Sequence, residues 1–428
     1  MTDQPRKKIT PPSPFVRALR SLVTDHRSAF AVVCAIIGIS VGAVAVLFQV
    51  LITGWTWVMT GYRHYGQTGG APHGIFGWHP LFVICTPAIS GLLAGIFINR
   101  FSPFARGHGV PEVMLAVRRK GGVIPGRVAL LKLLGTPLAI GGGGPVGKEG
   151  PIVQVGASIG SFLGTKLKLS TRQLTLLAGA GAAAGIAATF NTPLAGAVFA
   201  LEVILVSFTA ETIGMVTMAA VFGAVVAHEF LGDLHVVEIP EVGLTDNMDL
   251  WWVVVVALFA ALGGLLFSRS IFIIDDFFSL LYHGPNWARP AVGGLLVGIG
   301  LYFVPQMYGD VTATLHGIIT GDYSVPTLVV FFAAQVVFAS LVISSGGSGG
   351  VFGPTLFVGA TVGAIIGAFI APLAQSSITT FAVIGMGAAF GAAARAPLTA
   401  VLIILEMTGQ YSLILPMMLA VGLATGLS

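Results

Sequence analysis

Charged side chains are scarce in this chain: Asp, Glu, Lys and Arg make up 9% of its 428 residues, whereas 55% are hydrophobic. Soluble domains carry about 25% charged residues, so the composition excludes a soluble domain. Cysteine is also rare, and Cys34 and Cys85 both lie in apolar stretches, which argues against a disulfide framework. Nothing in the sequence resembles a basic surface interleaved with aromatic residues, so we expect no nucleic-acid partner.

Long apolar stretches take the place of the missing charge. A helix needs about 20 mostly apolar residues to cross a lipid bilayer. Stretches near or above that length lie at 28–58, 80–101, 171–208, 210–231, 250–281, 327–345 and 355–374. The sequence therefore predicts an all-α polytopic membrane protein.

Basic residues indicate how the chain is oriented. They gather before the first apolar stretch and near 118–120 and 166–172, whereas 232–249 is acidic. Because basic loops stay in the cytoplasm, we expect a cytoplasmic N-terminus in an inner (plasma) membrane protein. The predicted organisation is a cytoplasmic segment with an interfacial helix at 1–27, a first transmembrane half at 28–231, an extracellular acidic loop at 232–249 and a second transmembrane half at 250–428.

Residues 141–151 interrupt the apolar pattern with the sequence GGGGPVGKEGP. These glycines and prolines cannot continue a helix, and Pro151 suits the first turn of a new one. Glu149 is thereby placed at a helix N-terminus, where free N–H groups attract negative charge. A break at membrane depth must be buried or line a cavity, and a carboxylate there is a functional candidate. We interpret this break as an intramembrane anion site that carries its own competing anion.

A second break at 106–112 also ends in a proline that is followed by a carboxylate, Glu112. Lys132 follows in the apolar run 130–134. A lysine there is costly unless it faces a cavity or carbonyl groups. Lys132 therefore either extends to the membrane interface or supplies positive potential to the anion site.

An internal repeat relates the two halves of the chain. Gly150-Pro151 recurs as Gly353-Pro354 at an offset of 203, and Glu202 recurs as Glu406 at an offset of 204. The third break, at 344–354, has Phe352 in the place of Glu149. Interrupted hydrophobic segments at corresponding positions of two halves point to the binding site of a repeat-built transporter.

Three motifs in this sequence resemble the selectivity-filter motifs of the CLC family of chloride channels and transporters. They are Gly107-His108-Gly109-Val110-Pro111, Gly147-Lys148-Glu149-Gly150-Pro151 and Gly350-Val351-Phe352-Gly353-Pro354. The match extends through 191–196 and 405–408 and covers roughly residues 28–428.

The resemblance implies a fold of two inverted halves whose broken, tilted helices meet at a central anion site. It implies a homodimer with one pore in each subunit, chloride as the transported ligand, and neither a cofactor, a metal nor an enzymatic activity. Glu149 would be the gate. The anion-binding positions would be His108, Gly109, Lys148, Gly150, Val351 and Phe352.

Several features depart from the family pattern. His108 stands where most members have a serine, and Val203 stands where proton-coupled members usually have an internal glutamate. The neighbouring Glu202 is rotated by about 100° on a helix, so we expect its carboxylate to face elsewhere, in a structural role shared with Glu406. The sequence ends at Ser428, where the family continues with a helix that carries a pore-facing tyrosine.

These departures favour chloride conduction that is gated by Glu149 and is passive or only weakly coupled to protons. Protonation of Glu149 would remove its competition with chloride, and a protonated His108 would add a positive charge to the anion path. The alternative is a stoichiometric proton/chloride antiporter. A more remote alternative is a transporter for an organic anion.

Overall fold

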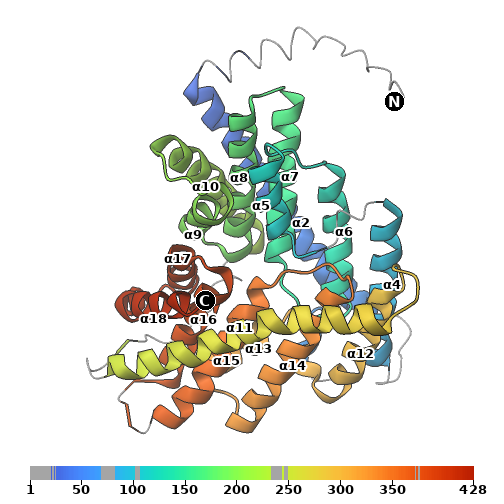
Figure 1. Cartoon of the computed structure of the whole chain (residues 1–428), viewed down its shortest axis with the longest axis vertical. Helices are drawn as coiled ribbons and strands as arrows, with labels where there is room; N and C mark the ends of the chain where they lie inside the picture. The colour runs from blue at the N-terminus through green and yellow to red at the C-terminus, as the bar shows by residue number, and fades with distance from the viewer. Residues whose placement is uncertain are drawn as a thin grey trace.

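The computed structural model describes residues 21, 24, 26–68, 82–101, 107–232, 243–244, 249–371, 373–374 and 376–428. The predicted interfacial helix within 1–27 and most of the predicted acidic loop at 232–249 lie outside these residues. Almost all of the described chain is helical (Figure 1).

The first half contains ten helical elements within the described residues. They are α2 (Arg27–Thr60), α3 (Tyr65–Thr68), α4 (Phe82–Phe101), α5 (Val110–Arg119), α6 (Arg127–Gly141), α7 (Glu149–Lys166), α8 (Thr171–Phe190), α9 (Pro193–Phe199), the π-helical η2 (Ala200–Leu205) and α10 (Ala210–Leu231).

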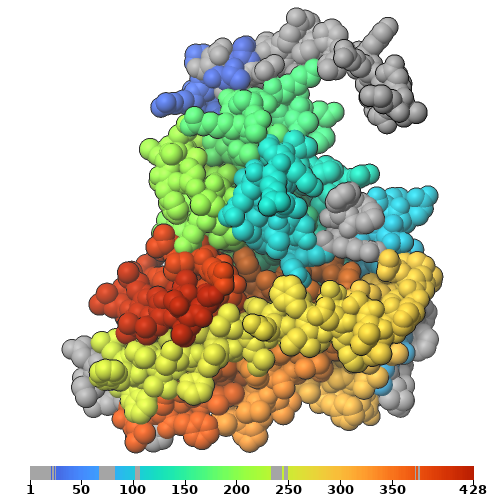
Figure 2. Space-filling model, in the orientation of Figure 1, coloured from blue at the N-terminus to red at the C-terminus, as the bar shows by residue number. Residues whose placement is uncertain are grey.

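The second half continues with a similar series. Its elements are α11 (Leu250–Leu281), α12 (Arg289–Phe303), the 3₁₀ turn η4 (Pro305–Met307), α13 (Thr312–Thr320), α14 (Val325–Ser344), α15 (Phe352–Ile370), α16 (Ile378–Ala394), α17 (Pro397–Thr408), the 3₁₀ turn η5 (Tyr411–Leu413) and α18 (Ile414–Gly426). Figure 2 shows these residues, from yellow to red, below most of the first half.

By length and composition, seven of the described helices can cross a membrane: α2, α4, α8, α10, α11, α14 and α15. Their outward faces are apolar. On α11, for example, Leu262 and Phe272 expose 58% and 70% of their surface. An apolar outer face combined with internally satisfied backbone groups is what a lipid environment requires. The prediction of an all-α polytopic membrane protein is confirmed.

The apolar stretch at 171–208 does not form one helix: it is divided among α8, α9 and η2. Helix α8 ends at Phe190, Asn191 adopts a left-handed conformation with φ of 55°, and α9 begins at Pro193. Asparagine tolerates this conformation, and proline at the start of a helix loses no hydrogen bond. The break therefore depends on two local residue types and not on hydropathy. The second half repeats it at Arg395, whose φ is 52°.

Paired glycines pack the repeated helices together. A Cβ on Gly156 of α7 would overlap the carbonyl oxygen of Gly181 of α8, and one on Gly181 would overlap that of Gly156. Gly359 of α15 and Gly385 of α16 stand in the same mutual relation. Small residues let helix backbones approach closely in membranes, where packing takes over from the hydrophobic effect. The repeat seen in the sequence is therefore a repeat of helix packing.

Each half also caps a short helix of the other half. The Glu202 carboxylate accepts hydrogen bonds from the backbone N–H groups of Leu398 (3.1 Å) and Thr399 (2.8 Å) at the start of α17. The Glu406 carboxylate accepts them from Leu194 (3.0 Å) and Ala195 (2.6 Å) at the start of α9. These reciprocal caps join the two halves through groups that a helix start otherwise leaves unpaired.

Candidate anion site

The break at 141–151 and the break at 344–354 pair with each other at the centre of the molecule. Gly147 N–H donates to the Gly350 carbonyl at 2.9 Å, and Gly350 N–H donates to the Gly147 carbonyl at 2.6 Å. Because α7 begins at Glu149 and α15 at Phe352, this bridge brings two helix N-termini together. In Figure 1, α7 lies in the upper part of the view and α15 in the lower part. Helix N-termini attract anions through their unpaired N–H groups and their dipoles.

The Glu149 side chain lies between these two helix starts. It is 5% exposed, and Oε2 accepts a hydrogen bond of 3.3 Å from the Gly353 N–H of α15. A Cβ on Gly147 would overlap that same oxygen, so the carboxylate needs glycine at this position. A carboxylate from the first half of the chain thus accepts a hydrogen bond from a backbone N–H at a helix start of the second half.

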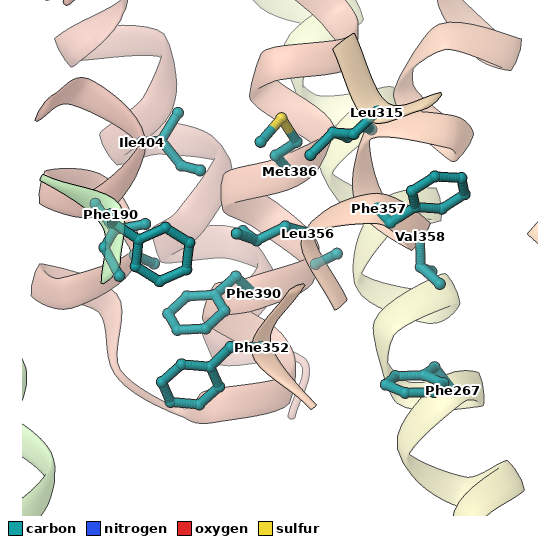
Figure 3. Close-up of a cluster of buried hydrophobic side chains, with 14 of the residues drawn as sticks. Phe190, Phe267, Leu315, Phe352, Leu356, Phe357, Val358, Met386, Phe390 and Ile404 are labelled. Atoms are coloured by element: carbon teal, nitrogen blue, oxygen red, sulfur yellow. The ribbon is translucent and has the colours of Figure 1, made fainter. Parts of the chain in front are cut away.

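Phe352 lies beside the same helix start and forms an aromatic wall. Its ring meets Phe199 of α9 edge-on, with ring centroids 5.5 Å apart, and Phe390 of α16 at 4.9 Å. Figure 3 shows Phe352 next to Phe390. Edge-on contacts are a favourable arrangement for aromatic pairs. They hold a buried apolar side chain at the position where the first half has a carboxylate.

The first filter motif is fixed by two charged side chains. Lys132 of α6 is fully buried, and its Nζ donates to the Gly107 carbonyl at 2.6 Å, so Lys132 does not extend to the membrane interface. The Glu112 carboxylate accepts the Gly109 N–H at 2.9 Å. Gly109 was a predicted anion-binding position, but its N–H is already bound by Glu112. The peptide that Lys132 and Glu112 hold contains His108.

Lys148 points to a cluster that the sequence did not predict. Its Nζ donates to Gln49 Oε1 at 2.8 Å and lies 3.4 Å from Asp310 Oδ2. Thr312 donates to the other oxygen of Asp310. Burial alone would raise the pKa of Asp310, but the Lys148 ammonium and the Thr312 hydrogen bonds outweigh it and lower the pKa to about 2. Neither Gln49 nor Asp310 lies in a motif, so no signal in the sequence connects them to Lys148.

The remaining predicted positions either form hydrogen bonds within the protein or lie at helix starts. The Glu202 carboxylate is bound by the start of α17, and the Val203 carbonyl accepts a long hydrogen bond of 3.4 Å from Arg118. Gly150, Pro151, Val351 and Pro354 lie at the starts of α7 and α15, as predicted, and Val110 and Pro111 begin α5. In the part of the chain that the structure describes, no group of three or more His, Cys, Asp or Glu residues is placed to hold a metal ion.

A cavity of about 260 Å³ opens next to the first filter motif. Residues of α4, α11 and α12 and of the third break form its walls. They include Ile98, His108, Asp275, Asn286, Arg289 and Ser345. Asp275 and Arg289 form an ion pair of 2.7 Å across it. The cavity lies beside the last turns of α4 and just before the start of α5.

Buried helix starts, a carboxylate on their amides and an apolar exterior define a polytopic membrane protein with a central anion site. Residues 90–428 match the family described as voltage gated chloride channel. The H(+)/Cl(-) exchange transporter ClcA of Yersinia pestis bv. Antiqua (strain Angola) is 32% identical over 421 residues, covering 94% of this chain and 85% of that protein. The chain therefore belongs to the voltage-gated chloride channel (CLC) family.

Two further relatives agree. The H(+)/Cl(-) exchange transporter ClcA of Vibrio parahaemolyticus serotype O3:K6 (strain RIMD 2210633) is 34% identical over 344 residues, covering 77% of this chain and 73% of that protein. The crystal structure of a slow cyanobacterial Cl-/H+ antiporter is similar with a TM-score of 0.83 and 24% identity, covering 94% of each chain. The predicted fold class is confirmed.

Proposed function

We propose that this protein exchanges chloride for protons across the membrane, with Glu149 serving both ions. The observation that carries the proposal is the position of the Glu149 carboxylate on the Gly353 amide. An ionised carboxylate there competes with chloride for the same amide. A protonated carboxyl has no charge to hold it at a helix start, so a proton on Glu149 frees the site for chloride.

The relatives support exchange over passive conduction. Both ClcA proteins carry proton/chloride exchange in their names, whereas the sequence of this chain favoured a passive or weakly coupled conductor because of Val203. The comparisons thus favour the function that the sequence left as the alternative. Because valine cannot carry a proton, Val203 cannot be part of the route by which protons reach Glu149. It does not prevent Glu149 from acting on both chloride and protons.

The proposal includes an assembly and an orientation. We propose a homodimer in the inner (plasma) membrane with a cytoplasmic N-terminus, as the family resemblance and the distribution of basic residues suggest. In that orientation Lys148, Gln49 and Asp310 face the extracellular entrance. His108 and the cavity beside it face the cytoplasm.

Flux from proteoliposomes tests this function. Purified protein is reconstituted with a chloride gradient and no proton gradient, and chloride efflux and proton influx are recorded together. Exchange predicts uphill proton movement in a fixed ratio to chloride. Chloride efflux without proton movement would establish passive conduction, and a preparation without chloride flux would contradict both functions.

A further inference from the structure

One titratable side chain that lines the cavity next to the first filter motif is not part of an ion pair. Three of its lining residues carry ionisable groups: His108, Asp275 and Arg289. Asp275 and Arg289 are paired with each other at 2.7 Å. His108 is left as the group on this cavity that has no ion-pair partner and that can both take up and release a proton, as histidine side chains do.

The two sides of the His108 ring lie in different surroundings. The residue is half-buried and lines the cavity, but its Nδ1 is buried without a hydrogen-bond partner. Buried polar atoms are paired in most proteins, so an unpaired ring nitrogen calls for an explanation. A nitrogen that donates or accepts a proton only during transport provides one.

His108 is close to the start of the helix that carries Glu149. A Cβ on Gly150 would overlap the His108 carbonyl oxygen, and one on Gly109 would overlap the Gly150 carbonyl oxygen. The backbone of the first filter motif therefore touches the residue after Glu149. His108 lies between the cavity and the first turn of α7.

Other carboxylates in this region are already bound. Both oxygens of Glu202 accept hydrogen bonds from the start of α17, and both oxygens of Glu406 accept them from the start of α9. Position 203 is a valine and cannot carry a proton. Within the described residues, His108 is thus the titratable residue that both lines this cavity and contacts the start of α7 through its backbone.

We propose that His108 carries protons between the cytoplasmic cavity and Glu149. This inference rests on the proposed exchange. The neutral imidazole takes a proton from cavity water on one nitrogen and releases the proton of its other nitrogen toward the Glu149 carboxylate. One proton enters and one leaves, so the ring is neutral before and after, and the carboxylate becomes a carboxylic acid. A shift between the two ring tautomers resets the path.

Charged groups of both signs face the ring. Burial of the ring is the strongest factor against the imidazolium. Glu112 on α5 and Asp275 on α11 favour the imidazolium, and Lys132 on α6 opposes it. Arg289 on α12 also lines the cavity and opposes it. Because Glu112 already binds the Gly109 N–H and Asp275 is paired with Arg289, neither carboxylate fixes the ring as a permanent cation.

His108→Asn tests the proposal, because asparagine keeps a hydrogen-bond donor near the anion path and cannot titrate. We expect the proton-to-chloride ratio in proteoliposomes to fall about tenfold or more, as for loss of a general acid–base group. The ratio is the readout because His108 is also a predicted anion-binding position, so the substitution is expected to change the chloride flux as well. His283→Asn is the matched control, since His283 is an exposed histidine just after α11. It should keep the wild-type ratio.

The outcomes separate this inference from the proposed function. Wild-type protein that moves chloride without protons would contradict exchange itself. Wild-type exchange together with an unchanged ratio in His108→Asn would overturn the relay. His108→Ser provides a second variant: if both variants lose chloride and proton flux in parallel, His108 serves the anion alone and the relay is wrong. A relay also predicts that proton flux in either variant no longer depends on cytoplasmic pH.

Discussion

The two halves of this chain bring the same backbone to the centre of the molecule and equip it with different side chains. Each half provides a glycine that pairs with the other half, followed by a helix start: Gly147 precedes α7 and Gly350 precedes α15. Glu149 and Phe352 occupy the matching first positions. We propose that the symmetric backbone provides the place for an anion and that the difference in side chains gives the first half control of it.

A second pair of corresponding residues also combines the same backbone role with a different charge in the two halves. Lys132 on α6 and Gln335 on α14 stand at the repeat offset of 203, and both are fully buried. Lys132 donates to the Gly107 carbonyl at 2.6 Å, and Gln335 donates to the Pro145 carbonyl at 2.9 Å. Each side chain donates a hydrogen bond to a backbone carbonyl in one of the helix breaks. Lys132 adds a charge, and Gln335 does not.

The carboxylates differ in how firmly they are held. Glu202 and Glu406 each accept two backbone hydrogen bonds at a helix start. Glu149 has one, at 3.3 Å, from the other half. We therefore expect the first two to stay in place during transport and Glu149 to leave its position when chloride arrives.

The largest expected effect is that of Glu149→Gln. The neutral amide keeps the shape of the side chain and removes both the charge and the titration, so proton movement should be abolished. Chloride flux should also lose its rise at acidic pH, because that rise comes from protonation of the carboxylate. Phe352→Leu, at the matching position, should keep proton movement. Wild-type pH dependence in Glu149→Gln would show that another group is the gate.

Lys132→Gln should have the next largest effect, since it gives the first half the neutral donor of the second. Removing a buried positive charge near the site should weaken chloride binding about tenfold, given the strength of charge interactions at low effective dielectric. Calorimetric titration of detergent-solubilised protein with chloride measures this directly. Gln335→Met removes the matching neutral donor and should change chloride affinity much less. Equal losses in the two variants would assign Lys132 a purely structural role.

The reciprocal caps should respond alike to substitution. Glu202→Gln and Glu406→Gln each weaken one cap, and loss of a cap costs about 1 kcal/mol of stability. Thermal unfolding in detergent should show similar losses for both variants. Neither should change the proton-to-chloride ratio. A ratio that falls in Glu202→Gln alone would place Glu202 on the proton path and contradict its assignment as a cap.

The sequence was sufficient to predict the starts of the key helices. Glycine and proline at 150–151 and 353–354 predicted that α7 and α15 begin at the breaks, and they do. Contacts between distant residues could not be predicted. The Gly147–Gly350 bridge and the bond between Lys132 and Gly107 join separate elements, and no periodicity encodes such pairings. Hydropathy also failed at Asn191, where an apolar composition concealed a helix end.

The smallest expected effect concerns the entrance beside Lys148. Asp310 pairs with the Lys148 ammonium, and these two charges act on Glu149 with opposite signs. Asp310→Asn should leave the lysine charge uncompensated and raise the affinity for external chloride about threefold, as expected of a partly exposed pair. Asp322→Asn is the matched control, because Asp322 follows α13 and bonds to Thr320. External chloride dependence of flux that is the same in both variants would contradict this role.

In the proposed mechanism, Glu149 and the transported anion compete for one position on the Gly353 amide. Crystals of wild-type protein and of Glu149→Gln, grown in bromide, test it through the anomalous signal of bromide. We expect a bromide peak beside the Gly353 N–H in the Gln variant, and only the carboxylate at the same position in the wild type. A bromide peak there in wild type with the Glu149 carboxylate still in place, or no peak in the variant, would contradict it.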